Sequence, residues 1–195
     1  MSSNRINTKT RILDVTWRLL ESENTAIRMA DIAKAAGVSR QALYLHFPNR
    51  AELLVATTRH IDTVKNVDER LSRSRSAASG IERLQAFVEA WGGYIPEIHG
   101  ISVALRAMRD TDKEAAAAWE DRMQAVRQGC EAAVRAISED GYLKKELTEN
   151  AAVDLLWTLL SVENWERLVL ECGWSQSDYE KTLKQISEAT LLSRK

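Results

Sequence analysis

Two short helical patterns meet at Gly37 within residues 29–47, and this junction constrains the fold more than any other part of the chain. In the first pattern, apolar residues recur at helical spacing, and Ala33 is small enough for a second helix to cross closely above it. Gly37 then ends that helix, because a residue without a Cβ enters the left-handed conformation at little cost. Ser39 can accept a backbone N–H as the N-cap of the next helix. The spacing therefore predicts a helix-turn-helix.

The second helix of this motif is expected to have an inward and an outward face. Leu43 and Phe47, four residues apart, would face the interior. The residues that would point away are Arg40, Gln41, Tyr44 and Leu45. The second helix of a helix-turn-helix lies in the DNA major groove, where arginine pairs bidentately with guanine and glutamine with adenine. Arg40 and Gln41 are therefore candidates for base contact, the alternative being two solvated residues on a surface helix.

The sequence on both sides of Gly37 resembles a known family. Residues 31–40, Asp-Ile-Ala-Lys-Ala-Ala-Gly-Val-Ser-Arg, and residues 42–54, Ala-Leu-Tyr-Leu-His-Phe-Pro-Asn-Arg-Ala-Glu-Leu-Leu, are similar to the DNA-binding domain of the TetR (tetracycline-repressor-like) family. The resemblance covers about a quarter of the chain. It implies an all-α fold, with an N-terminal three-helix helix-turn-helix DNA-binding domain over residues 1–49. A C-terminal helical ligand-binding and dimerisation domain would follow over residues 50–195.

The resemblance also implies phosphate contacts near the recognition helix. Tyr44 and His46 are expected to be phosphate ligands, although His46 could equally cap a helix or pack. The family usually opens its second helix with a threonine and has a glycine after its first helix. Here the connection over residues 24–28 reads Asn-Thr-Ala-Ile-Arg, so Arg28 would replace a threonine contact with a charge.

The start of the fourth helix adds two further candidates. Pro48 stops the recognition helix, and Asn49 with Glu52 three residues later is typical of a capping box. The exposed N–H groups at such a helix start suit a phosphate, and Arg50 adds positive charge there. The expected DNA-binding residues are Arg28, Ser39, Arg40, Gln41, Tyr44, Leu45, His46, Asn49 and Arg50.

Charge is distributed unevenly along the 195 residues, although the net charge is only −1. Residues 1–50 carry eight Lys and Arg against four Asp and Glu, whereas the remainder carries 19 against 24. This asymmetry fits a DNA-binding domain joined to an acidic body. Two prolines, eight glycines and 45% hydrophobic residues favour long helices over disorder.

The sequence shows no pattern typical of membrane, metal or catalytic chemistry. No run of eighteen apolar residues occurs and the N-terminus lacks the apolar core of a signal peptide, so we expect a cytoplasmic protein without a membrane partner. Cys130 and Cys172 match no zinc or redox spacing, and the three histidines lack the spacing of metal ligands. Neither a Gly-rich phosphate loop nor a nucleophile elbow occurs. We therefore expect no metal, no cofactor and no enzyme activity.

Helical patterns continue through the rest of the chain. Residues 68–80, rich in serine and arginine, are the best candidate for a loop. A helix resumes at Ile81, and Gly92-Gly93 with Pro96 is expected to interrupt it. The other helices are expected over residues 8–22, from 50 into the sixties, and over 98–109, 112–137, 150–171 and from 175 onward.

The last third of the chain predicts a dimer interface. The helix expected over residues 150–171 is apolar almost all round in its first half, so it must be buried on more than one side. Gly173-Trp-Ser followed by a final amphipathic helix also resembles the dimerising region of the TetR family, which implies a two-fold four-helix interface. The residues expected there are Leu155, Leu156, Leu159, Leu160, Tyr179, Leu183 and Ile186.

Aromatic and methionine side chains in the helical body are the candidates for an apolar ligand pocket. Each of them, taken singly, is more often core or dimer interface. Because the family carries its effector site in this region, some are expected to line a cavity. The candidates are Trp91, Tyr94, Met108, Trp119, Met123 and Trp157.

The resemblance as a whole implies a ligand-responsive transcriptional regulator. It would act as a homodimer on a palindromic double-stranded DNA operator and be released by a small, largely apolar effector. Repression is favoured over activation, although nothing in the sequence places the operator relative to a promoter. Two alternatives remain open: a DNA-binding protein without an effector, and an all-helical enzyme whose only support is a helical body with a possible pocket.

Overall fold

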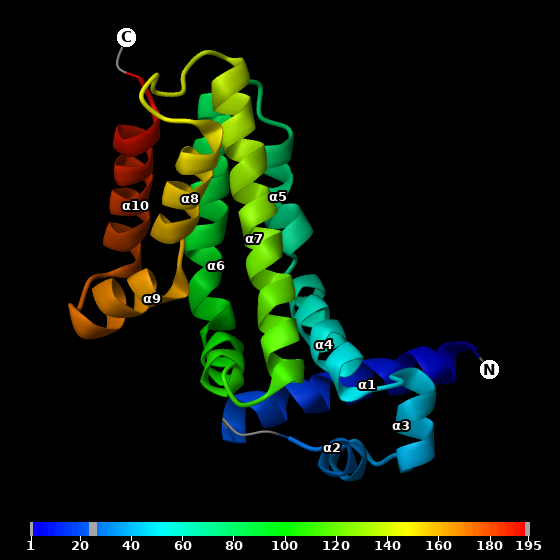
Figure 1. Ribbon diagram of the computed structural model, residues 1–195. Helices are drawn as coiled ribbons and strands as arrows, with labels where there is room; N and C mark the ends of the chain where they lie inside the picture. Colours follow the sequence, from blue (N-terminus) through cyan, green and yellow to red (C-terminus); the bar gives the residue numbers. More distant parts are fainter. Residues whose placement is uncertain (1, 24–26, 194–195) are drawn as a thin grey trace. The chain divides into compact units, whose positions relative to one another are not determined.

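The computed structural model describes residues 2–23 and 27–193, and within these residues it contains helices and no strands (Figure 1). The all-α prediction is confirmed. The chain forms two compact units, which we call the first unit (residues 1–65 and 98–123) and the second unit (residues 66–97 and 124–195). The expected domain boundary between residues 49 and 50 stays a prediction. In the described ranges, no helix is both long and apolar enough to cross a membrane.

The first unit is built around the helix-turn-helix. Its core consists of fully buried aliphatic side chains, among them Ile12, Leu20, Ile32, Leu43 and Leu53. Burial of such side chains stabilises each by about 1.5–3 kcal/mol relative to exposure. Its helices are α1 (Ser2–Glu23), α2 (Met29–Ala35), α3 (Arg40–His46) and α4 (Arg50–Val64), with the end of α6 (Gly80–Met108) and the start of α7 (Lys113–Glu139). The first helix begins six residues before its expected start, and residues 24–26 of the predicted connection lie outside the described residues.

The second unit contains the remaining helices. Gly80, at the start of α6, lies so close to α7 that an added Cβ would be 2.5 Å from the backbone of Ala136 and Ile137. Its backbone N–H donates to the carboxylate of Asp140 at 2.6 Å. Only glycine allows this approach of the two helices. The other elements of the unit are α5 (Val67–Arg75), α8 (Glu149–Leu159), α9 (Val162–Trp165), a π-helix η1 (Glu166–Glu171) and α10 (Gln176–Leu191).

The loop expected over residues 68–80 is wrong for its first part, because residues 67–75 form α5 and only residues 76–79 connect it to α6. Asp68 lies in its first turn and Arg75 in its last, so the charges complement the helix dipole. Ser74 is buried and donates its hydroxyl to the carbonyl of Arg83 on α6 at 3.0 Å. The serine-rich composition indicated a loop, whereas this packing and the charge placement favour a helix.

The interruption expected at residues 92–96 is also wrong, because α6 continues from Gly80 to Met108. Pro96 lacks an N–H, which leaves the carbonyl four residues earlier, at Gly92, without its helical donor. The side-chain amide of Gln176, at the start of α10, donates to the Gly92 carbonyl at 3.0 Å. Gly92 faces α10, since an added Cβ would lie 3.4 Å from a methyl carbon of Leu183, an ordinary van der Waals contact.

The helix expected over residues 150–171 is broken into three pieces. α8 ends at Leu159, and Ser161 caps α9 by accepting from the backbone N–H of Asn164 at 3.3 Å. The break exposes carbonyl groups that side chains then satisfy. Asn164 donates to the Thr158 carbonyl at 2.6 Å, and the indole of Trp91 donates to the Leu160 carbonyl at 2.8 Å.

Candidate nucleic-acid interface

The turn between α2 and α3 has the predicted geometry (Figure 1). Gly37 has a φ of +64°, the left-handed conformation that ends the first helix. The N–H of Val38 donates to the Ala33 carbonyl at 3.0 Å and that of Gly37 to the Lys34 carbonyl at 3.2 Å. These two bonds form a Schellman motif. The turn therefore fixes the direction in which α3 leaves it.

The recognition helix α3 has the two faces that its sequence predicted. Leu43 and Phe47 are buried, which anchors the helix in the first unit. Ser39 caps it by accepting from the backbone N–H of Ala42 at 3.1 Å. The outward residues Arg40, Gln41, Tyr44 and Leu45 are all exposed.

Arg40 and Gln41 occupy the first turn of α3, where a helix-turn-helix contacts base edges. Neither side chain forms a hydrogen bond or an ion pair with the residues that the structure describes. Their donors and acceptors are therefore available to a partner. A guanidinium and an amide side by side on an exposed helix match the bidentate patterns of guanine and adenine.

The expected phosphate ligands around α3 lie in different settings. Tyr44 is about half exposed, at 48%, and His46 is half-buried with its ring tilted against Phe47 at 6.5 Å between centroids. Arg28 is 83% exposed and pairs with Asp31 at 3.2 Å. A surface pair of this kind contributes little to stability, so Arg28 can exchange its carboxylate for a phosphate at small cost.

The expected N-cap at Asn49 is confirmed, but Glu52 returns the bond to the Asn49 side-chain amide and not to the backbone N–H that defines a capping box. The side-chain oxygen of Asn49 accepts from the backbone N–H of Glu52 at 2.8 Å, and its amide donates to the Glu52 carboxylate at 3.0 Å. Asn49 remains exposed. It holds the turn between α3 and α4, so its first role is to orient the recognition helix.

Arg50 lies in a different environment from the exposed phosphate site that we expected. Its side chain is only 11% exposed. It donates to the Ile27 carbonyl at 2.6 Å, and the same guanidinium contacts Asp112 at 2.7 Å and Glu114 at 3.1 Å. We call Arg50, Asp112 and Glu114 the Arg50 cluster. The exposed setting expected for Arg50 is therefore wrong, because its guanidinium pairs with carboxylates within the first unit, whereas phosphate binding by Arg50 stays a prediction.

The carboxylate of Asp112 is the centre of the Arg50 cluster. Burial of Asp112 opposes its ionisation, but the backbone N–H of Ala115 and the Arg50 guanidinium outweigh that effect. Together they hold the pKa of Asp112 below its ordinary value. The residue is therefore charged at neutral pH, and the cluster joins the starts of α4 and α7 by charge-assisted hydrogen bonds.

A second charged cluster lies further along α4, and we call it the Arg122 cluster. Arg122 on α7 pairs with Asp121 at 2.6 Å and with Asp62 on α4. Arg59 on α4 also pairs with Asp121, at 2.7 Å. Burial raises the pKa of Asp121, but the hydrogen bonds and charges of Arg59 and Arg122 together have the larger, opposite effect. The pKa of Asp121 therefore lies below its ordinary value. Sequence reasoning missed both clusters, because their partners lie about sixty residues apart along the chain.

The residues expected to line a ligand pocket divide between the two units. Trp91 and Tyr94 lie edge to face at 5.8 Å in the second unit, where Tyr94 is buried. Trp157 belongs to the same unit, with the Arg127 guanidinium 5.3 Å above its ring. The candidates in the first unit are Met108, Trp119 and Met123.

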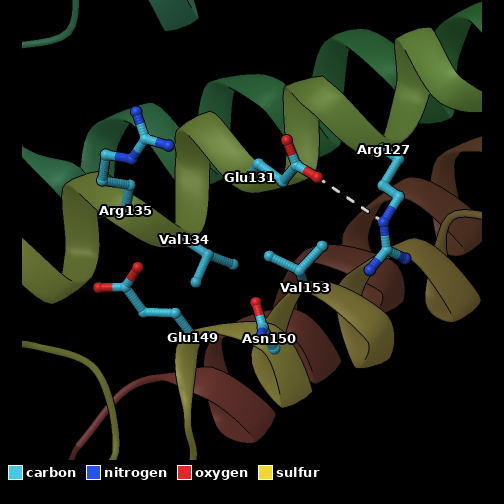
Figure 2. A pocket seen from close by; sticks show the side chains of 7 residues that line it. All are labelled: Arg127, Glu131, Val134, Arg135, Glu149, Asn150 and Val153. Carbon is cyan, nitrogen blue, oxygen red and sulfur yellow. Dashed lines mark ion pairs between the residues drawn. The ribbon is translucent and has the colours of Figure 1, made fainter.

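The second unit has a cavity of about 140 Å³ between α7 and α8 (Figure 2). None of the aromatic residues that we expected to line a ligand pocket is among the residues that line this cavity. Arg127 at its edge is already paired with Asp154 at 2.7 Å and with Glu131 at 3.7 Å. The volume is below the roughly 300–1,000 Å³ of typical ligand sites. The residues around it are Arg127, Glu131, Val134, Arg135, Glu149, Asn150 and Val153.

The expected dimer-interface residues divide by exposure. Leu156, Leu160, Tyr179 and Leu183 are buried in the second unit. They fill the core of their own subunit, so the exposed apolar residues are the stronger candidates, and the interface assignment as a whole stays a prediction. Leu155 and Ile186 are 40% and 42% exposed, and Leu159 is half-buried. Leu170 on η1, which the sequence did not single out, is 57% exposed.

Comparison with known proteins decides the family. Residues 12–57 match the family model described as bacterial regulatory proteins, tetR family. The HTH-type transcriptional regulator CymR of Pseudomonas putida is 31% identical over 183 residues, which cover 89% of this chain and 81% of CymR. The chain belongs to the TetR family. This TetR-family protein is therefore a DNA-binding transcriptional regulator and not an enzyme.

Two further relatives are similar over different extents of the TetR-family chain. The HTH-type transcriptional repressor LfrR of Mycolicibacterium smegmatis is 38% identical over 65 residues, about a third of either protein (33% of this chain and 34% of LfrR). A transcriptional regulator from Saccharomonospora viridis, solved in complex with choline, has a TM-score of 0.72 at 21% identity and covers 100% of both chains. The latter likeness shows that the fold is shared over the whole chain.

Proposed function

We propose that the protein is a homodimeric repressor that binds a palindromic operator and is released by a small, largely apolar effector. The observation that carries the proposal is the outward face of α3, where Arg40 and Gln41 are exposed above a buried helix-turn-helix core. The relative LfrR is itself named a repressor, which favours repression over activation.

The exposure of the side chains around α3 determines which residues we assign to DNA contact. Arg40 and Gln41 would read base edges, while Arg28, Tyr44 and His46 would position the domain on phosphates. Ser39 and Asn49 would contribute chiefly through the helix caps that they form. In a two-fold dimer the two α3 helices would meet half-sites about one helical turn, roughly 34 Å, or a multiple of it apart.

The dimer would use the apolar side chains that remain exposed on α8 and α10. Leu155 and Ile186 are the candidates, with Leu159 beside them. We expect the double variant Leu155→Asp, Ile186→Asp to be monomeric, because two charges would be buried without partners in the interface. The measurement is molar mass by light scattering, with twice the monomer mass expected for the natural protein.

Val64→Asp is the matched control for the dimer test. Val64 is an apolar residue on α4 with 48% exposure, so its replacement introduces one aspartate at a similarly exposed site outside the proposed interface, against two in the double variant. The control should remain dimeric. A natural protein that is monomeric, or a double variant that stays dimeric, would contradict the assignment of α8 and α10.

The effector would bind in the second unit near the ring pair of Trp91 and Tyr94. The choline complex of the Saccharomonospora viridis regulator shows that a protein of this fold can hold a small molecule. By linkage, an effector weakens DNA binding only to the extent that it binds the DNA-incompetent conformation more tightly. A melting-temperature screen of hydrophobic ligands, followed by tryptophan fluorescence, separates this proposal from a DNA-binding protein without an effector.

Selection from a randomised duplex library by the full chain tests the DNA-binding part of the proposal. We expect enriched sequences to contain a two-fold symmetric motif. A motif without symmetry would contradict binding as a dimer. If no motif is enriched, the proposal that α3 reads a specific sequence is contradicted.

A further inference from the structure

Leu45 is the most exposed large apolar side chain of α3. It is 71% exposed, compared with 48% for Tyr44, while Leu43 on the opposite face is fully buried. The helix is anchored by its inward residues alone, so Leu45 contributes little to its stability. Apolar surface left in water is unfavourable, and burial against an apolar partner removes that cost.

The position of Leu45 relative to Gln41 restricts what that partner can be. The two residues are four apart on α3 and therefore lie on the same face. Four residues advance a helix by about 6 Å, which corresponds to one or two steps of the DNA duplex at about 3.4 Å each. If Gln41 contacts one base pair, Leu45 lies within reach of a pair one or two steps away.

Only one base-edge group in the major groove is apolar. The other groups there are hydrogen-bond donors and acceptors, whereas thymine presents its C5 methyl group. A leucine gains nothing from the polar groups. Gln41, which shares this face, is polar, and the exposed side chain next to Leu45 in the sequence, Tyr44, ends in a hydroxyl. Leu45 therefore does not form part of a broad apolar patch that would indicate a protein partner.

We propose that Leu45 reads the C5 methyl group of a thymine located one or two base pairs from the pair contacted by Gln41. The inference rests on the proposed function, since it assumes that α3 lies in the major groove. It adds a specificity-determining residue whose contact is apolar. Leu45 discriminates thymine from cytosine and from uracil by the presence of that methyl group.

The test uses the operator duplex obtained by selection with the full chain. Each thymidine is replaced in turn by deoxyuridine, which keeps the pairing with adenine and removes only the methyl group. One substitution should weaken binding of the natural protein about fourfold, from loss of one buried methyl. The symmetric pair of substitutions should weaken it about fifteenfold, because both half-sites lose the contact.

Variants of the protein assign the effect to Leu45. Leu45→Ala should bind the thymidine and deoxyuridine duplexes equally, whereas Leu45→Met should keep the preference because its side chain is apolar and of similar size. Lys34→Ala, at an exposed position of α2, should also keep the preference for thymidine. A natural protein that is indifferent to every deoxyuridine, or a preference that survives Leu45→Ala, would overturn the inference. Failure to bind the selected duplex at all would instead contradict the proposed function.

Discussion

Replacing Arg50 with alanine is expected to lower the free energy of unfolding by about 3 kcal/mol, the lower end of the range for breaking a buried ion pair. The substitution removes the donor to the Ile27 carbonyl and leaves the carboxylates of Asp112 and Glu114 without their cation. Asp112 keeps two backbone donors, the N–H groups of Glu114 and Ala115, which limits the loss. Urea denaturation followed by circular dichroism measures the change.

Arg59→Ala is the matched control for Arg50→Ala. Arg59 also lies on α4 and pairs with an aspartate of α7 at 2.7 Å, but its side chain is 62% exposed. A pair this exposed is expected to contribute less than about 1 kcal/mol, because water and salt screen it. Equal stability losses in the two variants would contradict the structural role of the Arg50 cluster. If Arg50→Ala were fully stable yet weak on every DNA sequence, Arg50 would be a phosphate ligand after all.

Arg40→Ala should produce the largest loss of specific DNA binding. A bidentate arginine–guanine pair discriminates by about 1–3 kcal/mol, so loss of two such pairs in a dimer amounts to about 2–6 kcal/mol. Arg40 is exposed and outside the core, so the variant should fold normally. Binding to the selected duplex should fall, and the preference at one base position in each half-site should relax. Competition with single-base variants of the duplex measures both effects.

Lys34→Ala controls for the loss of positive charge. Lys34 is an exposed cation on α2, the first helix of the motif. Its removal should change the affinity for selected and scrambled duplexes by the same small factor, because a solvated charge carries no base information. If Arg40→Ala likewise weakened both duplexes equally, the assignment of Arg40 to a base edge would be contradicted.

The helix-turn-helix could be predicted from the sequence because its signals are local. Gly37, Ser39 and the spacing of Leu43 and Phe47 fall within eleven residues, and each has the role that the pattern indicated. Side chains that face outward on so short a helix are defined once the inward ones are known. The exposed candidates for base contact could therefore be named in advance.

The environment of Arg50 could not be predicted in this way. The sequence correctly placed it at the start of α4, but the direction of its side chain depends on Asp112, 62 residues later. The continuity of α6 likewise depends on a residue that is distant in sequence. A proline usually ends a helix, but the amide of Gln176, 84 residues after Gly92, satisfies the carbonyl that Pro96 leaves free.

Apolar periodicity also cannot distinguish the core of a subunit from its interface with a partner. Leu155 and Leu156 are adjacent in sequence and chemically identical, yet one is 40% exposed and the other fully buried. On α10, Tyr179 and Ile186 belong to one apolar stripe of the sequence, yet Tyr179 is buried and Ile186 is 42% exposed. Which apolar residue faces inward is decided by how α8 and α10 pack within the second unit.

The most direct test of sequence reading by α3 is fluorescence anisotropy of the full chain on the selected duplex and on a scrambled duplex of the same composition. The titrations are made at two salt concentrations. Since phosphate contacts are common to both duplexes, raising the salt should weaken binding to both, while the selected duplex remains bound more tightly. Equal affinities with the same steep salt dependence would contradict the account, because charge alone would then explain the binding.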